Sequence, residues 1–346
     1  MNTKNKLLWM ILFVLIAGAT IWTLTSQNRS FSFAAFRAYL QEMNSGWLAA
    51  AAASAFGFIF FEGAAVASAS RSFGYPAGPG RGLVYSASDI YFSAITPSAT
   101  GGQPACAYFM VKDGQPGTVA AAILLANLTM YTLSILLIGL VVFCCFPGIF
   151  LSLSPLSKTL ILAGYAVQLA FAAFFVLLLK NEKLLYRICA ALLSFACWLR
   201  LLRHKEERLA KLERTMAHYG ETVLALQGKP RMLVKLFFLN LLQRLSSIFV
   251  PVFVYLASGG QFRSAPLLLA MQSYVITGSN CIPIPGAMGV SDYLMLDAFG
   301  TIMTPEQSAN LELLSRSLSF YLCVILCGII TLAAFLIQKR KEHLSC

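Results

Sequence analysis

The chain has 346 residues, of which 58% are hydrophobic and only 12% are charged, and its formal net charge is +12. Its mean hydropathy is +0.72, whereas soluble domains use only about 45–50% apolar residues, so the composition excludes an ordinary soluble protein. The basic residues gather in a few segments without interleaved aromatic residues, which indicates cytoplasmic loops and excludes nucleic acid as a partner. We therefore predict an all-α, polytopic integral membrane protein.

Several apolar segments in the first half have the length of ~20 residues that crosses a bilayer. The first is not followed by a small-residue cleavage site, so we expect it to be retained as a span that runs outward. An interfacial helix is expected over 31–43, before the second span returns to the cytoplasm. The predicted spans are 7–24, 47–69, 118–146 and 160–179.

The middle of the chain is different, because apolar and basic residues alternate there. The segment 184–202 is apolar enough to cross the membrane, yet it contains Arg187 and Arg200 and has basic residues on both sides. We interpret it as part of an in-plane or cytoplasmic amphipathic hairpin, with a further span as the alternative. The charged stretch 203–214 is expected to continue it as a solvated helix.

The second half begins at Arg231, with predicted spans over 232–257 and 313–337 and a basic tail. The whole chain, 1–346, is expected to form a single transmembrane domain of about 6–8 spans. Its parts would be a first repeat over 7–179, the amphipathic segment over 184–230 and a second repeat over 231–337. Basic flanking residues predict a cell-membrane location with both termini in the cytoplasm.

Two short apolar segments, 83–95 and 266–276, are followed by polar breaks with the sequences TPSATGGQP (96–104) and PIPGAMGVSD (283–292). At ~1.5 Å per residue, neither apolar segment is long enough to cross. Short, interrupted segments at corresponding places in two halves indicate an inverted repeat, with two re-entrant hairpins that form a transporter's midplane site. The alternative is that both breaks are loops outside the bilayer.

Polar groups in and around the breaks could replace the water around a lipid headgroup. The hydroxyl groups of Thr96, Ser98 and Thr100 and the amide of Gln103 are suitable, and glycines allow close backbone approach. Arginine suits a phosphate, and a carboxylate suits a cationic headgroup or a proton. An unpaired charge at the bilayer centre costs about 2.5–3.5 kcal/mol, so a functional or pairing role is expected for Glu62, Asp89, Arg244, Asp292 and Arg316.

The nine cysteines and three histidines do not have the spacing of metal ligands. No Ser–His–Asp order, HExxH helix or GxxxxGK[ST] phosphate-binding loop is present. We therefore expect no metal, no cofactor and no catalytic residue, and transport that is downhill or ion-coupled.

Both breaks resemble those in the membrane region of the lysylphosphatidylglycerol synthase/flippase family, and the resemblance extends over about 7–337. In that family the first break has a proline followed by Gly-Glu or Gly-Gln, which correspond here to Pro97, Gly102 and Gln103. The second has Pro-x-Pro-Gly, another glycine and an acidic residue, usually Glu. Taken with the hydroxyl groups above, the expected substrate-binding residues are Thr96, Pro97, Thr100, Gly102, Gln103, Pro283, Pro285, Gly286, Gly289 and Asp292.

The resemblance implies a flippase-like lipid transporter for a phospholipid such as lysyl-phosphatidylglycerol, with links to lipid metabolism and antibiotic resistance. Bifunctional family members also have a large soluble aminoacyltransferase domain. The longest polar segment here, 203–229, is too short for one, so only the flipping half is implied. The implied partner is a phospholipid headgroup; a separate lipid-modifying enzyme and a second copy of the chain are also compatible partners. The alternatives are a membrane-embedded headgroup transferase that uses Glu62, Asp89 and Asp292, or a non-transporting partner subunit.

Overall fold

A computed structural model describes residues 40–96, 99–198, 205–280, 282, 287 and 289–344. The predicted span over 7–24 and most of the predicted helix over 31–43 lie outside the described residues. Within the described ranges the chain is helical and has no strand, which confirms an all-α membrane protein.

Five described helical segments are long and apolar enough to cross a membrane. Each coincides with a span predicted from the sequence, because an apolar run of ~20 residues or more is a strong local signal. They are α3 (Ser45–Ser72), α6 (Gly117–Cys145), α8 (Pro155–Lys180), α11 (Pro230–Ala257) and the continuous segment Pro305–Arg340.

The last of these segments begins earlier than the predicted residue 313. Its first helix, α14 (Pro305–Arg316), is capped by Thr304, whose hydroxyl oxygen accepts a hydrogen bond from the backbone N–H of Gln307 over 3.3 Å. This first part is polar, so hydropathy does not reveal it as part of the helix. A π-helical turn, η4 (Ser317–Leu322), then joins α14 to α15 (Cys323–Leu344).

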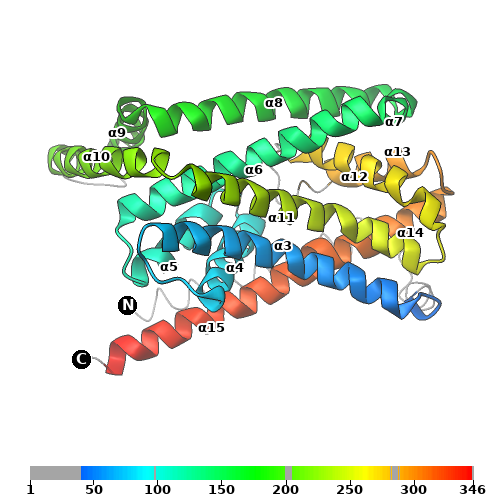
Figure 1. Ribbon diagram of the computed structural model, residues 1–346, viewed down its shortest axis with the longest axis horizontal. Coiled ribbons are helices and arrows are strands. Elements are labelled where there is room, and N and C mark those ends of the chain that lie inside the picture. The colour runs from blue at the N-terminus through cyan, green and yellow to red at the C-terminus, as the bar shows by residue number, and fades with distance from the viewer. Residues whose placement is uncertain are drawn as a thin grey trace.

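Two pairs of shorter helices lie between the long ones. α4 (Pro79–Ile95) and α5 (Gly102–Lys112) follow α3, whereas α12 (Ala265–Ser279) and α13 (Val290–Phe299) follow α11. At ~1.5 Å per residue α4 is only ~26 Å long, and the other three are shorter still. Figure 1 shows the two pairs toward opposite ends of the long helices, α4 and α5 to the left and α12 and α13 to the right.

The remaining helices connect these parts. A short helix, α7 (Pro147–Ser152), joins α6 to α8, and a 3-10 turn, η2 (Phe262–Ser264), precedes α12. α9 (Glu182–Trp198) is shorter than the five candidate spans. With α10 (Lys205–Gln227) it lies at the left end of the molecule in Figure 1, where α10 buries Tyr219 in the core.

Glycines allow the short helices to approach the long ones closely. A Cβ atom at Gly63 of α3 would lie 2.4 Å from the carbonyl oxygen of Gly82 in α4. A Cβ atom at Gly164 of α8 would lie 2.5 Å from the carbonyl oxygen of Thr277 in α12. Small residues at such crossings let helices pack by close van der Waals contact in lipid, where the hydrophobic effect is weak.

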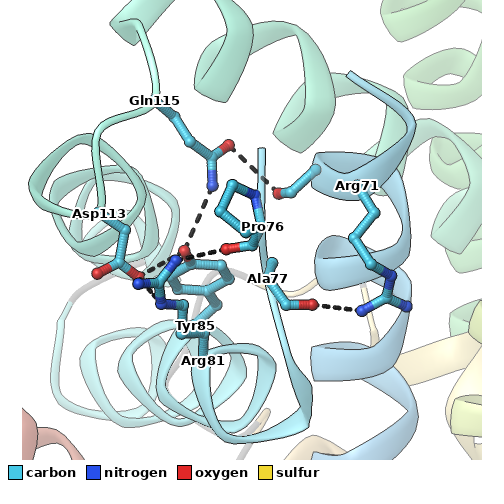
Figure 2. A network of polar contacts seen from close by, with 8 residues as sticks. Arg71, Pro76, Ala77, Arg81, Tyr85, Asp113 and Gln115 are labelled. Carbon is cyan, nitrogen blue, oxygen red and sulfur yellow. Dashed lines mark hydrogen bonds and ion pairs between the residues drawn. The ribbon is translucent and has the colours of Figure 1, made fainter. Parts of the chain in front are cut away.

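Polar contacts close the base of the α4–α5 pair (Figure 2). The hydroxyl of Tyr85 donates a hydrogen bond to Asp113 Oδ2 over 2.7 Å. Gln115 Nε2 donates to the same hydroxyl over 3.3 Å, and its Oε1 accepts from Ser70 Oγ over 3.2 Å. These bonds join α3, α4 and the turn after α5, so α4 and α5 form a hairpin.

Two arginines hold the loop between α3 and α4 at the same end (Figure 2). Arg71 donates to the carbonyl oxygen of Ala77, and Arg81 donates to that of Pro76. Arg81 Nε also lies 3.6 Å from Asp113 Oδ2, although this ion pair is half exposed and is worth at most about 1 kcal/mol. These contacts fix the conformation of the loop at the basic end of the hairpin.

We predict that Lys112 and Gln307 face opposite sides of the membrane. Both residues are exposed, and their helices, α5 and α14, lie toward opposite ends of the long helices (Figure 1). Single cysteines at these positions, on a cysteine-free background, should be labelled by an impermeant reagent from opposite sides. Labelling of both positions from the same side would contradict the arrangement.

A second prediction concerns the glycine crossing. Gly63→Ala should lower stability by about 1–3 kcal/mol, because its methyl group would overlap a backbone oxygen and push α3 and α4 apart. Thermal unfolding in detergent measures this. Gly80→Ala is the matched control in α4, since nothing lies within 4 Å of the added Cβ; equal unfolding temperatures for the two variants would show that the crossing is not close.

Candidate functional site

The first hairpin has a buried acidic pair. The carboxyl groups of Asp89 on α4 and Glu62 on α3 lie within hydrogen-bonding distance of each other, and each residue is only 8% exposed. Gln103 Nε2 donates to Asp89 Oδ2 over 2.7 Å, and Ser93 Oγ donates to Asp89 Oδ1 over 3.1 Å. The start of α5 is therefore bound to the middle of α4 at this pair.

The break between α4 and α5 is folded tightly onto the same carboxyl group. Thr96 Oγ1 accepts a hydrogen bond from the backbone N–H of Gly101 over 2.9 Å. A Cβ atom at Gly102 would lie 2.0 Å from Asp89 Oδ1, so only glycine permits this approach. The Gly-Gln pair of the break thus serves two purposes: the glycine allows contact, and the glutamine makes it.

Helix α11 adds an amide and a guanidinium group. Gln243 Nε2 donates to Glu62 Oε2 over 3.0 Å. Arg244 interacts favourably with the charge of Glu62, and its guanidinium lies over the rings of Phe58 and Tyr131, at 4.9 and 4.3 Å from their centroids. Because Arg244 is only 7% exposed, its charge must be balanced inside the protein.

Tyr131 connects this cluster to the second hairpin. Its hydroxyl donates a hydrogen bond to Asn280 Oδ1 over 2.6 Å, and Asn280 directly follows α12. A series of polar contacts therefore leads from the first hairpin through the bundle to the second break. We call this series the polar chain; its members are Gln103, Asp89, Glu62, Gln243, Arg244, Tyr131 and Asn280.

The second hairpin has its own charged cluster. Asp292 on α13 forms an ion pair with Arg316, with Oδ1 and Nη2 2.6 Å apart, and its Oδ2 accepts from the backbone N–H of Gly289 over 2.8 Å. Glu312 Oε1 lies 3.7 Å from Arg316 Nε, and its carboxyl group is within hydrogen-bonding distance of Asp292. The π-helical turn η4 begins immediately after Arg316.

The two hairpins thus share a pattern of charge and backbone conformation. Beside each hairpin lie two carboxyl groups in contact with each other and one arginine: Glu62, Asp89 and Arg244 at the first, and Asp292, Glu312 and Arg316 at the second. Each break also has an alanine in the left-handed region, Ala99 at φ 53° and Ala287 at φ 49°. Across the described ranges, no group of three or more His, Cys, Asp or Glu side chains is arranged to hold a metal ion.

The residues predicted from the sequence divide between these places. Thr96, Gly102 and Gln103 gather around Asp89, whereas Gly289 lies beside Asp292. Thr100 is exposed in the first break. Of the intramembrane charges, Glu62, Asp89 and Arg244 lie in one cluster and Arg316 in the other. Four predicted residues lie outside the described part of the chain: Pro97, Pro283, Pro285 and Gly286.

Some members of these clusters were not predicted. Gln243 and Tyr131 are single polar residues within apolar spans, which is a recognisable but weak signal when the residue is uncharged. Glu312 was missed because the last span was predicted to begin one residue after it. Asn280 lies between α12 and the second break, where a polar residue attracts no notice in the sequence.

Comparison with known families agrees with this architecture. The chain matches the family model described as the lysylphosphatidylglycerol synthase TM region over residues 9–327, which include both hairpins. No curated protein and no solved structure matches the chain at a significant level. The match covers most of the 346 residues, and the chain therefore belongs to the lysylphosphatidylglycerol synthase transmembrane-region family, a membrane family with a lipid-related role.

Proposed function

We propose that this protein is a flippase-like transporter that moves a phospholipid across the cell membrane. The observation that carries this proposal is the polar chain, which connects the two hairpins inside a bundle of apolar helices. A phospholipid headgroup needs polar partners across a hydrocarbon core of ~30 Å, whereas its acyl chains can remain in the lipid. A series of buried and partly buried polar contacts supplies such partners.

The side chains of the polar chain suit an aminoacylated phospholipid such as lysyl-phosphatidylglycerol. The planar guanidinium of Arg244 can bind two phosphate oxygens, and the carboxyl groups of Glu62 and Asp89 can bind an ammonium group. In the structure these groups bind one another, so a headgroup would have to replace protein contacts one by one. The bond between Gln103 and Asp89 and the ion pair between Asp292 and Arg316 connect the two breaks to these clusters.

The substrate-binding residues that we propose are those of the two breaks, arranged as an inverted repeat with one hairpin entering from each side. Glycines and hydroxyl groups there would approach the headgroup as it passes between the hairpins. In this arrangement both termini lie in the cytoplasm, since the basic segments flank the ends of the spans.

A groove beside the first hairpin could hold an acyl chain. It has a volume of about 170 Å³ and is lined by Phe60, Ala64, Ala67 and Arg71 of α3 and by Pro79 and Leu83 of α4. Its apolar walls suit a hydrocarbon chain, and Arg71 places a positive charge at the basic end of the hairpin. A lipid bound here would have its phosphate close to the base of α4.

We predict that Gln103→Ala and Asp292→Asn reduce lipid movement about tenfold or more, because each removes a hydrogen bond or ion pair to a charged group worth about 1.5–3 kcal/mol. The measurement is transbilayer movement of labelled lysyl-phosphatidylglycerol in proteoliposomes, with thermal stability recorded alongside. Asp292→Glu should retain activity, because it keeps the carboxylate.

The controls are Gln261→Ala and Glu306→Gln, which make the same kinds of change at exposed positions away from both clusters. They should move lipid at the wild-type rate. If Gln103→Ala and Asp292→Asn also do so, the breaks are not the transport path. A new lipid species formed by the purified protein would instead favour the headgroup-transferase alternative.

A further inference from the structure

The acidic pair of the first hairpin has a chemical property beyond headgroup binding. Two carboxyl groups that lie within hydrogen-bonding distance cannot both be ionised without strong repulsion, so such a pair retains a proton. Glu62 and Asp89 together with Arg244 would have a net charge of −1 if both acids were ionised. One proton shared by the pair makes the cluster neutral, which is the state that a low-dielectric interior favours.

Other groups around the pair support a bound proton. Gln243 Oε1 and Arg244 Nε, on side chains that are 2% and 7% exposed, have no hydrogen-bond partner among the described residues. Gln243 donates from its Nε2 to Glu62 Oε2 over 3.0 Å, so its amide group is bound to the acidic pair while its Oε1 can still accept a hydrogen bond. A buried amide that binds one of the acids and keeps a free acceptor suits a site that gains and loses a proton.

The titratable groups that face the pair do not remove the need for this proton. They are the thiols of Cys106 on α5 and Cys327 on α15, which are uncharged at neutral pH, and the guanidinium of Arg244 on α11. Gln103 and Ser93 contribute neutral donors only. A second positive charge is therefore absent from the described surroundings of the pair.

We propose that Glu62 and Asp89 form a proton-binding site that couples proton movement to lipid movement; the coupling rests on the function proposed above. When the proton leaves, two adjacent carboxylates repel each other across the interface between α3 and α4. Asp89 also holds the start of α5 through Gln103 and the close approach of Gly102. Proton loss therefore loosens the whole α4–α5 hairpin and frees its polar groups for a headgroup.

The proton itself can be detected without any transport assay. In infrared spectra of the purified full-length protein at neutral pH, exposed carboxyl groups are ionised and a protonated carboxyl group has a distinct C=O band. Glu62→Gln and Asp89→Asn should each remove intensity equal to one protonated carboxyl group, and Glu306→Gln, an exposed matched control, should remove none. Isotope labelling of Glu and Asp side chains in the wild-type protein tests the same band if the variants do not fold.

Unchanged intensity in both folded variants, or no labelled band in the wild type, would overturn the proton site. The pair would bind sodium rather than a proton if the band appeared only when sodium was replaced by choline, which would also overturn it. For the coupling, an imposed pH gradient should change wild-type lipid movement several-fold. If the gradient does not change the wild-type rate of lipid movement, the coupling is overturned and the proton site is not. If the protein moves no lipid at all, the proposed transport function is overturned, and the infrared result is unaffected.

Discussion

Burial of charge within apolar helices is the constraint on which the rest of this structure depends. Glu62, Asp89 and Arg244 are each at least nine-tenths buried, and hydrocarbon offers them no water. They can be tolerated only if α3, α4 and α11 meet at one place, since each helix contributes one charge. The glycine crossing between α3 and α4 and the glycine at the start of α5 are what allow that meeting. Packing of the hairpin and neutralisation of charge are therefore a single requirement.

The charges beside the second hairpin must also be balanced, but they are distributed differently over the helices. There the arginine and one acid, Arg316 and Glu312, lie one turn apart on a single helix, and only Asp292 comes from the hairpin. The cluster is also less deeply buried, with side-chain exposures of 11–20%. A π-helical turn follows it, and such turns frequently occur where a helix must accommodate a functional site. The two halves thus have the same charges, but the charges of the second are less deeply buried.

Much of the architecture follows from the sequence because it depends on local properties. The spans after residue 40 were predicted closely, since hydrophobic length alone decides whether a segment can cross. The interruptions after α4 and after α12 were also evident, because several glycines and prolines cluster there. Hydropathy did not predict the start of α14, because its first turn is polar. That turn is helical because Thr304 caps it, and hydropathy does not detect a cap. For that reason Glu312 was not predicted to belong to the last span.

The sequence by itself determined that the protein is helical, spans a membrane and has two interrupted hairpins containing ionisable residues. Only the tertiary structure decided which of those residues meet. Gln243 and Glu62 are 181 positions apart, and Tyr131 and Asn280 are 149 apart, so neither contact has a signature in any local pattern. The tertiary structure also showed that Arg316 forms an ion pair with Asp292 and that Arg244 lies in the cluster of Glu62 and Asp89. Partners of this kind are set by how helices cross, which depends on the packing of many small residues together.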